Sequence, residues 1–206
     1  MDDKETSENL PTPPEETEPE SVRSGFLLFL WDFFKVFAIA IAVIIPIRWF
    51  LFQPFVVTGD SMKPNFHDGN YLVIDELSYR LREPARGEVV VLRAPNSPNE
   101  FFIKRVVGLP GERIVVEDGH VRIYSEEHPE GAVLQESYLP NNNLTYGNVD
   151  TLLRKDEYFV LGDNRLSSSD SRFWGTLRRS EIIGRAVIRV FPVSEFTIFP
   201  TPQYEQ

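Results

Sequence analysis

The sequence contains no cysteine among its 206 residues. This absence excludes disulfides, thiolate-ligated metal sites and a thiol nucleophile, so the fold is independent of the redox state of its compartment. Basic residues are also in the minority, because 21 Lys and Arg stand against 31 Asp and Glu for a formal net charge of −10. Nucleic-acid affinity comes largely from Lys and Arg that neutralise phosphates, so this balance predicts no nucleic-acid partner.

Histidine is scarce as well, with three in the whole chain. His67, His120 and His128 are not spaced as metal ligands or as members of a catalytic triad. The acidic residues form no ligand-spaced cluster with them of the kind that zinc hydrolases use. We therefore expect neither a metal nor any other cofactor.

The N-terminal residues 1–24 have little that a folded core could bury. They are rich in Pro, Glu, Thr and Ser, and residues 1–20 contain eight acidic residues and one lysine. Such a composition predicts a disordered acidic tail. Its two possible roles are a solvated extension without a fixed partner and a regulatory or docking segment.

Residues 25–53 reverse this composition and predict a transmembrane anchor helix. The 20-residue stretch Phe33–Phe52 is about 30 Å long at a rise of about 1.5 Å per residue, which matches the hydrocarbon core of a bilayer. Arg48 and Trp49 suit a headgroup boundary at its end. The lipid bilayer is thus an expected partner, although the flanking charges do not fix the orientation of the helix.

Two other structures for this apolar segment are less favoured. A cleaved signal peptide would have a shorter apolar region, and no small-x-small site follows the run, which an acidic segment precedes. A buried core helix without a polar face would need protein around its whole circumference.

From Pro54 onward, short segments of β-forming residues are separated by turn residues. No helix-length periodicity lies between them, so residues 54–206 predict a mainly β, antiparallel domain. Asp118-Gly119 predicts a hairpin turn, whereas residues 125–156 have few apolar positions and predict an excursion or loop on the β body. The expected strands are Tyr71–Ile74, Glu88–Leu92, Phe101–Val107, Arg113–Val116, Val121–Tyr124, Tyr158–Leu161 and Ala186–Phe191.

Two adjacent cations, Lys104 and Arg105, lie within one expected strand. Because side chains alternate across a strand, they must point to opposite faces, and apolar residues such as Phe102 and Ile103 share both faces. At least one cation therefore faces apolar surroundings, unless this is an edge strand from which both reach water. Burial lowers the pKa of a lysine and turns its amine into a base.

Two further segments could contribute chemistry. Thr58-Gly59-Asp60-Ser61-Met62-Lys63-Pro64 places a serine in a turn, although such turns are common by themselves. The stretch from Gly162 to Gly175 contains two Asp, two Arg and a Trp. It is either a solvated polar loop or a functional one.

Together these segments resemble the type I signal peptidase family of membrane-anchored serine proteases. The matching motifs are Gly59-Asp60-Ser61-Met62-x-Pro64, Lys104 to Glu112, and Gly162 to Gly175, in the family's order and after a membrane segment. The resemblance covers roughly residues 26–195. It implies a β-rich catalytic domain on the trans, extracytoplasmic side of the cell membrane that removes signal peptides from exported preproteins after a small-x-small site.

The resemblance also implies the roles of individual residues. Ser61 corresponds to the nucleophile and Lys104 to its general base. The matching supporting residues are Ser168 as the serine that orients the lysine amine, Asp170 and Arg172 as an ion pair beneath the site, and Arg105 and Asp163 as further supports. The positions that correspond to the shallow substrate pockets are Phe55, Val57, Met62, Phe66, Phe102 and Ile103.

One position departs from part of the family. Where some members have a serine whose hydroxyl donates to the oxyanion, this chain has Gly59. The backbone N–H of Ser61 should still contribute, and Thr58 is a candidate second donor.

Two other functions stay open at this point. One is self-cleavage by a Ser–Lys dyad, as in the LexA-type repressors, which carry a DNA-binding module where this chain has an acidic tail and an anchor. The other is a membrane-tethered β domain that binds peptides without cutting them. The presence of both Ser61 and Lys104 argues against that function.

Overall fold

The computed structural model describes residues 21–50, 52–95, 97–140 and 144–200. Most of the predicted acidic tail, residues 1–20, lies outside the described residues. The chain divides into two compact units, Met1–Ile45 and Pro46–Gln206. Each unit is described by itself.

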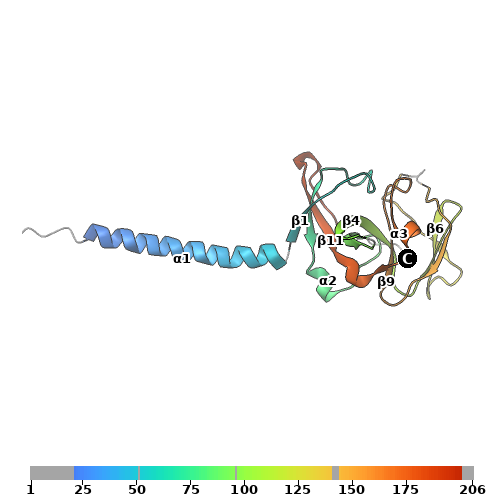
Figure 1. Cartoon of the computed structure of the whole chain (residues 1–206), viewed down its shortest axis with the longest axis horizontal. Helices are drawn as coiled ribbons and strands as arrows, with labels where there is room; N and C mark the ends of the chain where they lie inside the picture. The colour runs from blue at the N-terminus through green and yellow to red at the C-terminus, as the bar shows by residue number, and fades with distance from the viewer. Residues whose placement is uncertain (1–20, 51, 96, 141–143, 201–206) are drawn as a thin grey trace, which may run out of the picture. The chain divides into compact units, whose positions relative to one another are not determined.

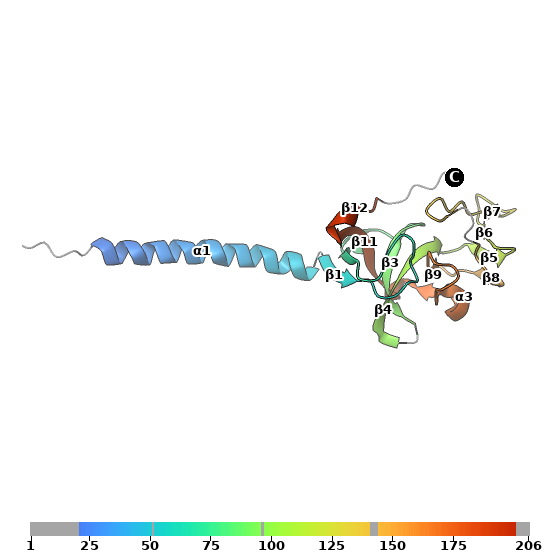
Figure 2. The ribbon, with the colours of Figure 1, turned by 90° about the horizontal axis from the view of Figure 1, so that it is seen from above.

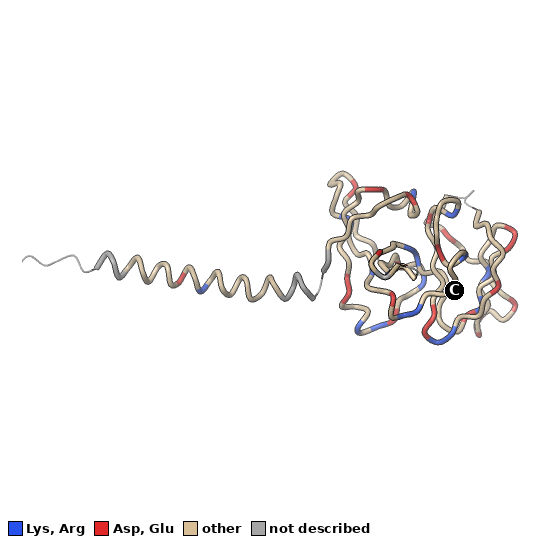
Figure 3. The backbone as a smooth tube through the Cα atoms, in the orientation of Figure 1, with Lys and Arg blue, Asp and Glu red and all other residues tan. Residues whose placement is uncertain are grey.

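A single long helix, α1, runs from Ser21 to Phe50 (Figure 1). Its 21-residue section Gly25–Ile45 has the length and composition to cross a membrane, and its side chains are exposed on every side. Within that section the charged residues are Asp32 and Lys35, which form an ion pair at 3.2 Å, and Figure 3 shows the uncharged stretches on either side. A helix that is apolar around its whole circumference is suited to lipid surroundings.

The apolar section starts at Gly25, where the predicted anchor of residues 25–53 also starts. Residues 26–31 are as apolar as those that follow, and they extend the helix toward the N-terminus. At the other end the helix stops at Phe50, and Phe52 belongs to a strand.

The β-rich unit contains two antiparallel sheets within its described residues. The strands of the larger sheet are β1 Phe52–Val56, β2 Tyr71–Asp75, β3 Val89–Ala94, β4 Ser97–Gly108, β9 Glu157–Leu161, β10 Leu177–Arg178, β11 Ile182–Phe191 and β12 Thr197–Ile198. The strands of the smaller sheet are β5 Arg113–Glu117, β6 His120–Tyr124, β7 Ala132–Val133 and β8 Val149–Leu152. The short helices are α2 Ser78–Leu81, α3 Ser171–Trp174, η1 Arg179–Glu181 and η2 Val193–Glu195.

The order of the larger sheet is β1-β2-β11-β3-β4-β9-β10, with β12 paired to β11, and that of the smaller is β7-β6-β5-β8. Figure 2 shows β5 to β8 gathered at one end of the unit. The predicted mainly β, antiparallel fold is confirmed, and each of the seven expected strands is present.

The Asp118-Gly119 turn joins β5 to β6, with Glu117 opposite His120. Both turn residues have positive φ, 50° and 79°, which is the backbone of the type I′ hairpin that Asp-Gly favours. The stretch predicted as an excursion, residues 125–156, contains β7 and β8, which were not expected. They are two and four residues long, too short for a readable alternation of apolar and polar side chains.

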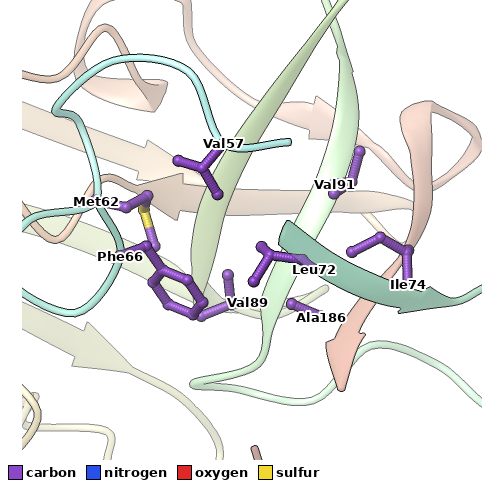
Figure 4. Close-up of a cluster of buried hydrophobic side chains, with 8 residues drawn as sticks. All are labelled: Val57, Met62, Phe66, Leu72, Ile74, Val89, Val91 and Ala186. Carbon is purple, nitrogen blue, oxygen red and sulfur yellow. The ribbon is translucent and has the colours of Figure 1, made fainter. Parts of the chain in front are cut away.

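The core of the larger sheet lies on both of its faces. Val89 and Val91 of β3 point into one cluster, while Val90 and Leu92 point into another. Figure 4 shows the first cluster, in which Val57, Met62 and Phe66 of the loop after β1 meet side chains of β2, β3 and β11. A third cluster joins the two sheets, because Phe159 and Leu161 of β9 pack with residues of β5 and β6.

Candidate functional site

Lys104 on β4 and Ser61 in the turn after β1 meet in space, although 43 residues separate them in sequence. The Lys104 Nζ donates to the Ser61 Oγ at 2.9 Å and to the backbone oxygen of Ile103 at 2.9 Å. It also lies 5.2 Å from the centre of the Phe102 ring. Lys104 is only 3% exposed, so its amine is held against one hydroxyl in apolar surroundings.

Burial lowers the pKa of Lys104 from 10.5 to about 8, because the charged amine is separated from water. The carboxylates of Asp170 and Asp163 act in the opposite direction and keep the pKa from falling further. A lysine with this pKa is neutral in a substantial fraction of molecules near pH 8. A neutral amine 2.9 Å from a hydroxyl can accept its proton.

Arg105 points to the other face of β4 and is 7% exposed. Its Nε and Nη2 donate to the two carboxylate oxygens of Asp163 at 2.8 and 2.6 Å, and its Nη1 donates to the Gly87 carbonyl at 2.8 Å. Both cations of the strand are therefore buried, and neither reaches water as an edge-strand residue would. Arg105 is neutralised by a bidentate ion pair, whereas burial acts on Lys104 by lowering its pKa.

The turn that carries Ser61 is held by Asn164. The Asn164 backbone N–H donates to the Ser61 carbonyl at 3.0 Å, and its Nδ2 donates to the Asp60 carbonyl at 3.1 Å. On the other side, the Gly59 N–H donates to the Asp68 Oδ1 at 2.8 Å. Asn164 lies within the polar stretch that starts at Gly162, but it is not among the residues to which the resemblance gives a role.

Gly59 has a φ of +85°, a backbone conformation in which residues with a side chain are strained. A Cβ there would contact nothing within 4 Å, so the backbone and not crowding is what favours glycine. The positive φ therefore explains why this chain has a glycine where some family members have a serine hydroxyl that donates to the oxyanion. Thr58 is exposed, and its role as a second oxyanion donor stays a prediction.

Asp170 and Arg172 form a buried ion pair, with their side chains 0% and 3% exposed. The Arg172 Nε and Nη2 each donate at 2.8 Å to the Asp170 carboxylate. Asp170 also accepts from the Gly162 N–H at 3.1 Å and caps the N-terminus of α3. This carboxylate therefore links α3 to the loop beside Ser61.

Ser168 is 8% exposed, and its hydroxyl has no hydrogen-bond partner in the part of the chain that the structure describes. A Cβ on Gly162 would collide with both the Ser168 Oγ and the Ser61 carbonyl, so this hydroxyl lies beside the nucleophile turn. The hydrogen bond to the Lys104 amine that the resemblance implied is not formed here. A buried hydroxyl without a partner is uncommon and calls for a functional explanation.

We expect Ser168→Ala to slow the peptidase reaction that the resemblance implies about ten- to a hundredfold, because the hydroxyl would bond to the Lys104 amine once that amine is protonated. Since the buried hydroxyl has no hydrogen-bond partner among the described residues, its removal should not lower the free energy of unfolding. Initial rates and urea titrations measure the two effects. The control variant is Ser167→Ala, because Ser167 is the exposed serine next to Ser168. Cleavage by the Ser168 variant at the parent rate would refute the role.

The six expected substrate-pocket residues fall into two groups. Val57, Met62 and Phe66 are at most 4% exposed and belong to the core cluster of Figure 4, so they can only support a pocket from behind. Three others are partly exposed and offer surface: Phe55, Phe102 and Ile103. Two cavities, of about 260 and 1140 Å³, do not include Ser61 or Lys104 in their linings, and Arg105 lines both.

An open strand edge lies beside Lys104. Residues Phe101–Lys104 of β4 pair with β3 on one side, while the pairing of β4 with β9 starts only at Arg105. Among the described residues, the other side of Phe101–Lys104 has no strand partner. An extended peptide can add to such an edge through main-chain hydrogen bonds.

The described residues contain no group of three or more His, Asp or Glu side chains arranged to hold a metal ion. The three histidines are exposed. The site is thus built from a serine hydroxyl, a lysine amine and two buried ion pairs.

The part of the chain that contains Ser61, Lys104 and the Gly162–Gly175 stretch is similar to known proteins. Residues 30–191 match the protein family described as signal peptidase, peptidase S26. A probable signal peptidase I-2 from Synechocystis sp. is 36% identical over 198 residues, which cover 92% of this chain and 81% of that protein. The signal peptidase I of Leptolyngbya laminosa is 33% identical over 98% of both chains, and one from Bacillus amyloliquefaciens is 34% identical over 79% of this chain and 86% of its own.

Proposed function

Because this chain belongs to the signal peptidase family of S26 peptidases, it is a serine endopeptidase that removes signal peptides from preproteins, and we propose that Ser61 is its nucleophile and Lys104 its general base. The single observation that carries this assignment is the 2.9 Å hydrogen bond between the Ser61 Oγ and a lysine amine whose pKa is lowered to about 8.

In the proposed reaction, neutral Lys104 accepts the proton of the Ser61 hydroxyl as the Oγ attacks the scissile carbonyl of the preprotein. The tetrahedral intermediate collapses when the Lys104 ammonium returns the proton to the departing amine. A water molecule, deprotonated by the same lysine, then attacks the acyl ester, and the Lys104 ammonium returns the proton to the departing Ser61 Oγ. This sequence follows the logic of the serine triad with a lysine in place of histidine.

The oxyanion of the intermediate is stabilised by the backbone N–H of Ser61 in this proposal, with Thr58 as the candidate second donor. The turn geometry supports it, since Asn164 bonds to the Asp60 carbonyl, which shares a peptide unit with the Ser61 N–H, and to the Ser61 carbonyl of the next peptide unit. Fixed donors need no reorganisation during the reaction.

We propose that the preprotein binds as an extended strand along Phe101–Lys104, with its small side chains toward Phe55 and Ile103. The unpaired edge of β4 supports the first part. The partial exposure of the two side chains supports the second. Both side chains pack against the core cluster, so they present a shallow apolar surface, which suits the small side chains of a small-x-small site.

The apolar helix α1 indicates a membrane-anchored enzyme. We propose that α1 is a single-pass anchor in the lipid bilayer of the cell membrane and that the β-rich unit lies on the extracytoplasmic side, where exported preproteins emerge. No nucleic-acid partner is proposed, in keeping with the net charge of −10.

The purified protein in detergent should cleave a preprotein that carries an Ala-x-Ala site, and Ser61→Ala should not, because the acyl ester needs the hydroxyl. Gel mobility and mass spectrometry of the products locate the cut. A non-catalytic peptide-binding domain would instead bind the preprotein and leave it intact. Equal cleavage by the Ser61→Ala protein would contradict the nucleophile assignment.

A further inference from the structure

The segment Glu136–Tyr138 lies between β7 and β8, in the stretch that the sequence predicted as an excursion (Figure 2). The Glu136 carboxylate forms a bidentate ion pair with the guanidinium of Arg165, whose Nη1 donates to the Glu136 Oε2 at 2.7 Å. The Arg165 side chain is 0% exposed and that of Glu136 is 13% exposed. The excursion thus supplies the counter-charge of a fully buried arginine.

Arg165 belongs to the loop that holds the nucleophile turn. Its Nε donates to the Gly162 carbonyl at 3.1 Å, and its backbone N–H donates to the Asp163 carbonyl at 3.1 Å. The residue before it, Asn164, makes the two hydrogen bonds to the Asp60 and Ser61 carbonyls. The Arg165 guanidinium, which is paired with Glu136, therefore holds the loop Gly162–Asn164, and Asn164 of this loop bonds to the turn that carries Ser61.

Tyr138 connects the same segment to the site by a second route. Its backbone oxygen accepts from the Asn65 Nδ2 at 2.9 Å, and the same Nδ2 lies 2.9 Å from the Asp163 Oδ2. The Arg105 guanidinium lies 4.0 Å from the centre of the Tyr138 ring. The Tyr138 hydroxyl donates to Glu136, so the two residues of the segment support each other.

On these contacts we propose that Glu136 is a positioning residue for the peptidase reaction. It acts through Arg165 on the loop Gly162–Asn164, which sets the Ser61 Oγ relative to the Lys104 amine. The inference rests on the proposed function of the dyad and adds to it a role for the excursion outside the three sequence motifs.

The physical reason is the burial of Arg165. A guanidinium with no access to water needs a compensating charge, and without one the side chain must move toward water or toward another carboxylate. Either movement breaks the hydrogen bond from the Arg165 Nε to the Gly162 carbonyl and so removes a support of the loop that contains Asn164. Small displacements of a nucleophile from its base reduce turnover strongly, whereas substrate contacts on β4 are left in place.

The test is Glu136→Gln, which keeps the shape of the side chain and removes its charge. We expect kcat for preprotein cleavage to fall about tenfold or more with KM within about twofold of the parent value. Glu130→Gln is the matched control, since Glu130 is an exposed glutamate of the same excursion. Glu136→Asp, which keeps the charge, should have a kcat between those of the parent and Glu136→Gln.

A double variant separates positioning from general destabilisation. If Glu136 acts through Arg165, adding Glu136→Gln to Arg165→Gln should lower kcat little beyond the effect of Arg165→Gln alone. Rates are measured well below the melting temperature and divided by the concentration of folded protein, which circular dichroism gives. A variant that folds poorly therefore still gives a kcat.

Three results would overturn the inference: a Glu136→Gln kcat within twofold of the parent, a Glu136→Asp enzyme no faster than Glu136→Gln, or multiplicative losses in the double variant. Failure of the proposed function is a different result, because then the parent protein and Glu130→Gln would not cleave the preprotein either.

Discussion

Lys104→Met should abolish preprotein cleavage and, at pH 7, raise the free energy of unfolding by about 3 kcal/mol. The pKa of Lys104 is about 8 in the folded protein against 10.5 for the ordinary group, and each pKa unit corresponds to about 1.36 kcal/mol. Below pH 8 the buried amine is charged in both states, so the folded protein bears the full cost of burying that charge. Methionine fills a similar volume without a charge.

The sign of the pH dependence follows from proton binding. Between pH 8 and 10.5 the unfolded chain holds a proton on Lys104 that the folded protein has lost, so the parent protein gains stability as pH rises through this window. The difference in the free energy of unfolding between Lys104→Met and the parent should therefore become smaller between pH 8 and 10.5. Urea unfolding at pH 7 and at pH 10.5 measures it. Lys155→Met, at an exposed lysine, is the control and should show no such trend.

The activity of the parent enzyme should rise with pH through an apparent pKa of about 8, because only neutral Lys104 accepts the serine proton. Lys104→Arg should be inactive, since a guanidinium does not lose its proton in proteins. A rate that is constant from pH 6 to 10, or measurable turnover by Lys104→Arg, would refute lysine as the base.

Asp170→Ala should destabilise the protein by about 3 to 5 kcal/mol and reduce cleavage. Its carboxylate is 0% exposed, and its removal leaves the Arg172 guanidinium without its carboxylate partner in a buried site. The Gly162 N–H and the N-terminus of α3 lose their acceptor at the same time. Thermal and urea unfolding measure the loss.

The pH profile gives a second readout of Asp170. Its negative charge raises the pKa of Lys104, so in the alanine variant the residual activity should rise at a lower pH than in the parent. The double variant Asp170→Ala with Arg172→Ala should be less destabilised than the two single losses combined. Asp150→Ala, which breaks the exposed pair with Arg113, should change stability little. Additive losses at Asp170 and Arg172 would contradict a coupled pair.

Local sequence signals were sufficient for much of the architecture. The apolar run predicted the long helix, because a helix without a polar face needs no partner information to be recognised. Strand alternation predicted β4 and placed Lys104 and Arg105 on opposite faces, and Asp118-Gly119 predicted its hairpin. These are properties of a few consecutive residues, so the chain alone determined them.

The site depended on contacts between distant parts of the chain. The separations are 43 residues from Ser61 to Lys104, 58 from Arg105 to Asp163, and 104 from Asp60 to Asn164. No periodicity or turn signal reports which strands pair or where a loop packs. The motifs therefore indicated which residues carry chemistry, and the sheet order decided that their atoms meet.

Burial and partners were likewise decided by tertiary packing. Met62 and Phe66 correspond to pocket positions in the motifs, yet the loop after β1 folds over β2 and β3 and closes them into the core. Glu136 gave no local signal at all, because a single glutamate in a polar stretch is indistinguishable from surface until Arg165 is placed against it. The chain alone determined the long apolar helix, most of the strands and the candidate chemical groups. Only the folded structure decided which of those groups lose water and which charges face each other, because both depend on neighbours far away in sequence.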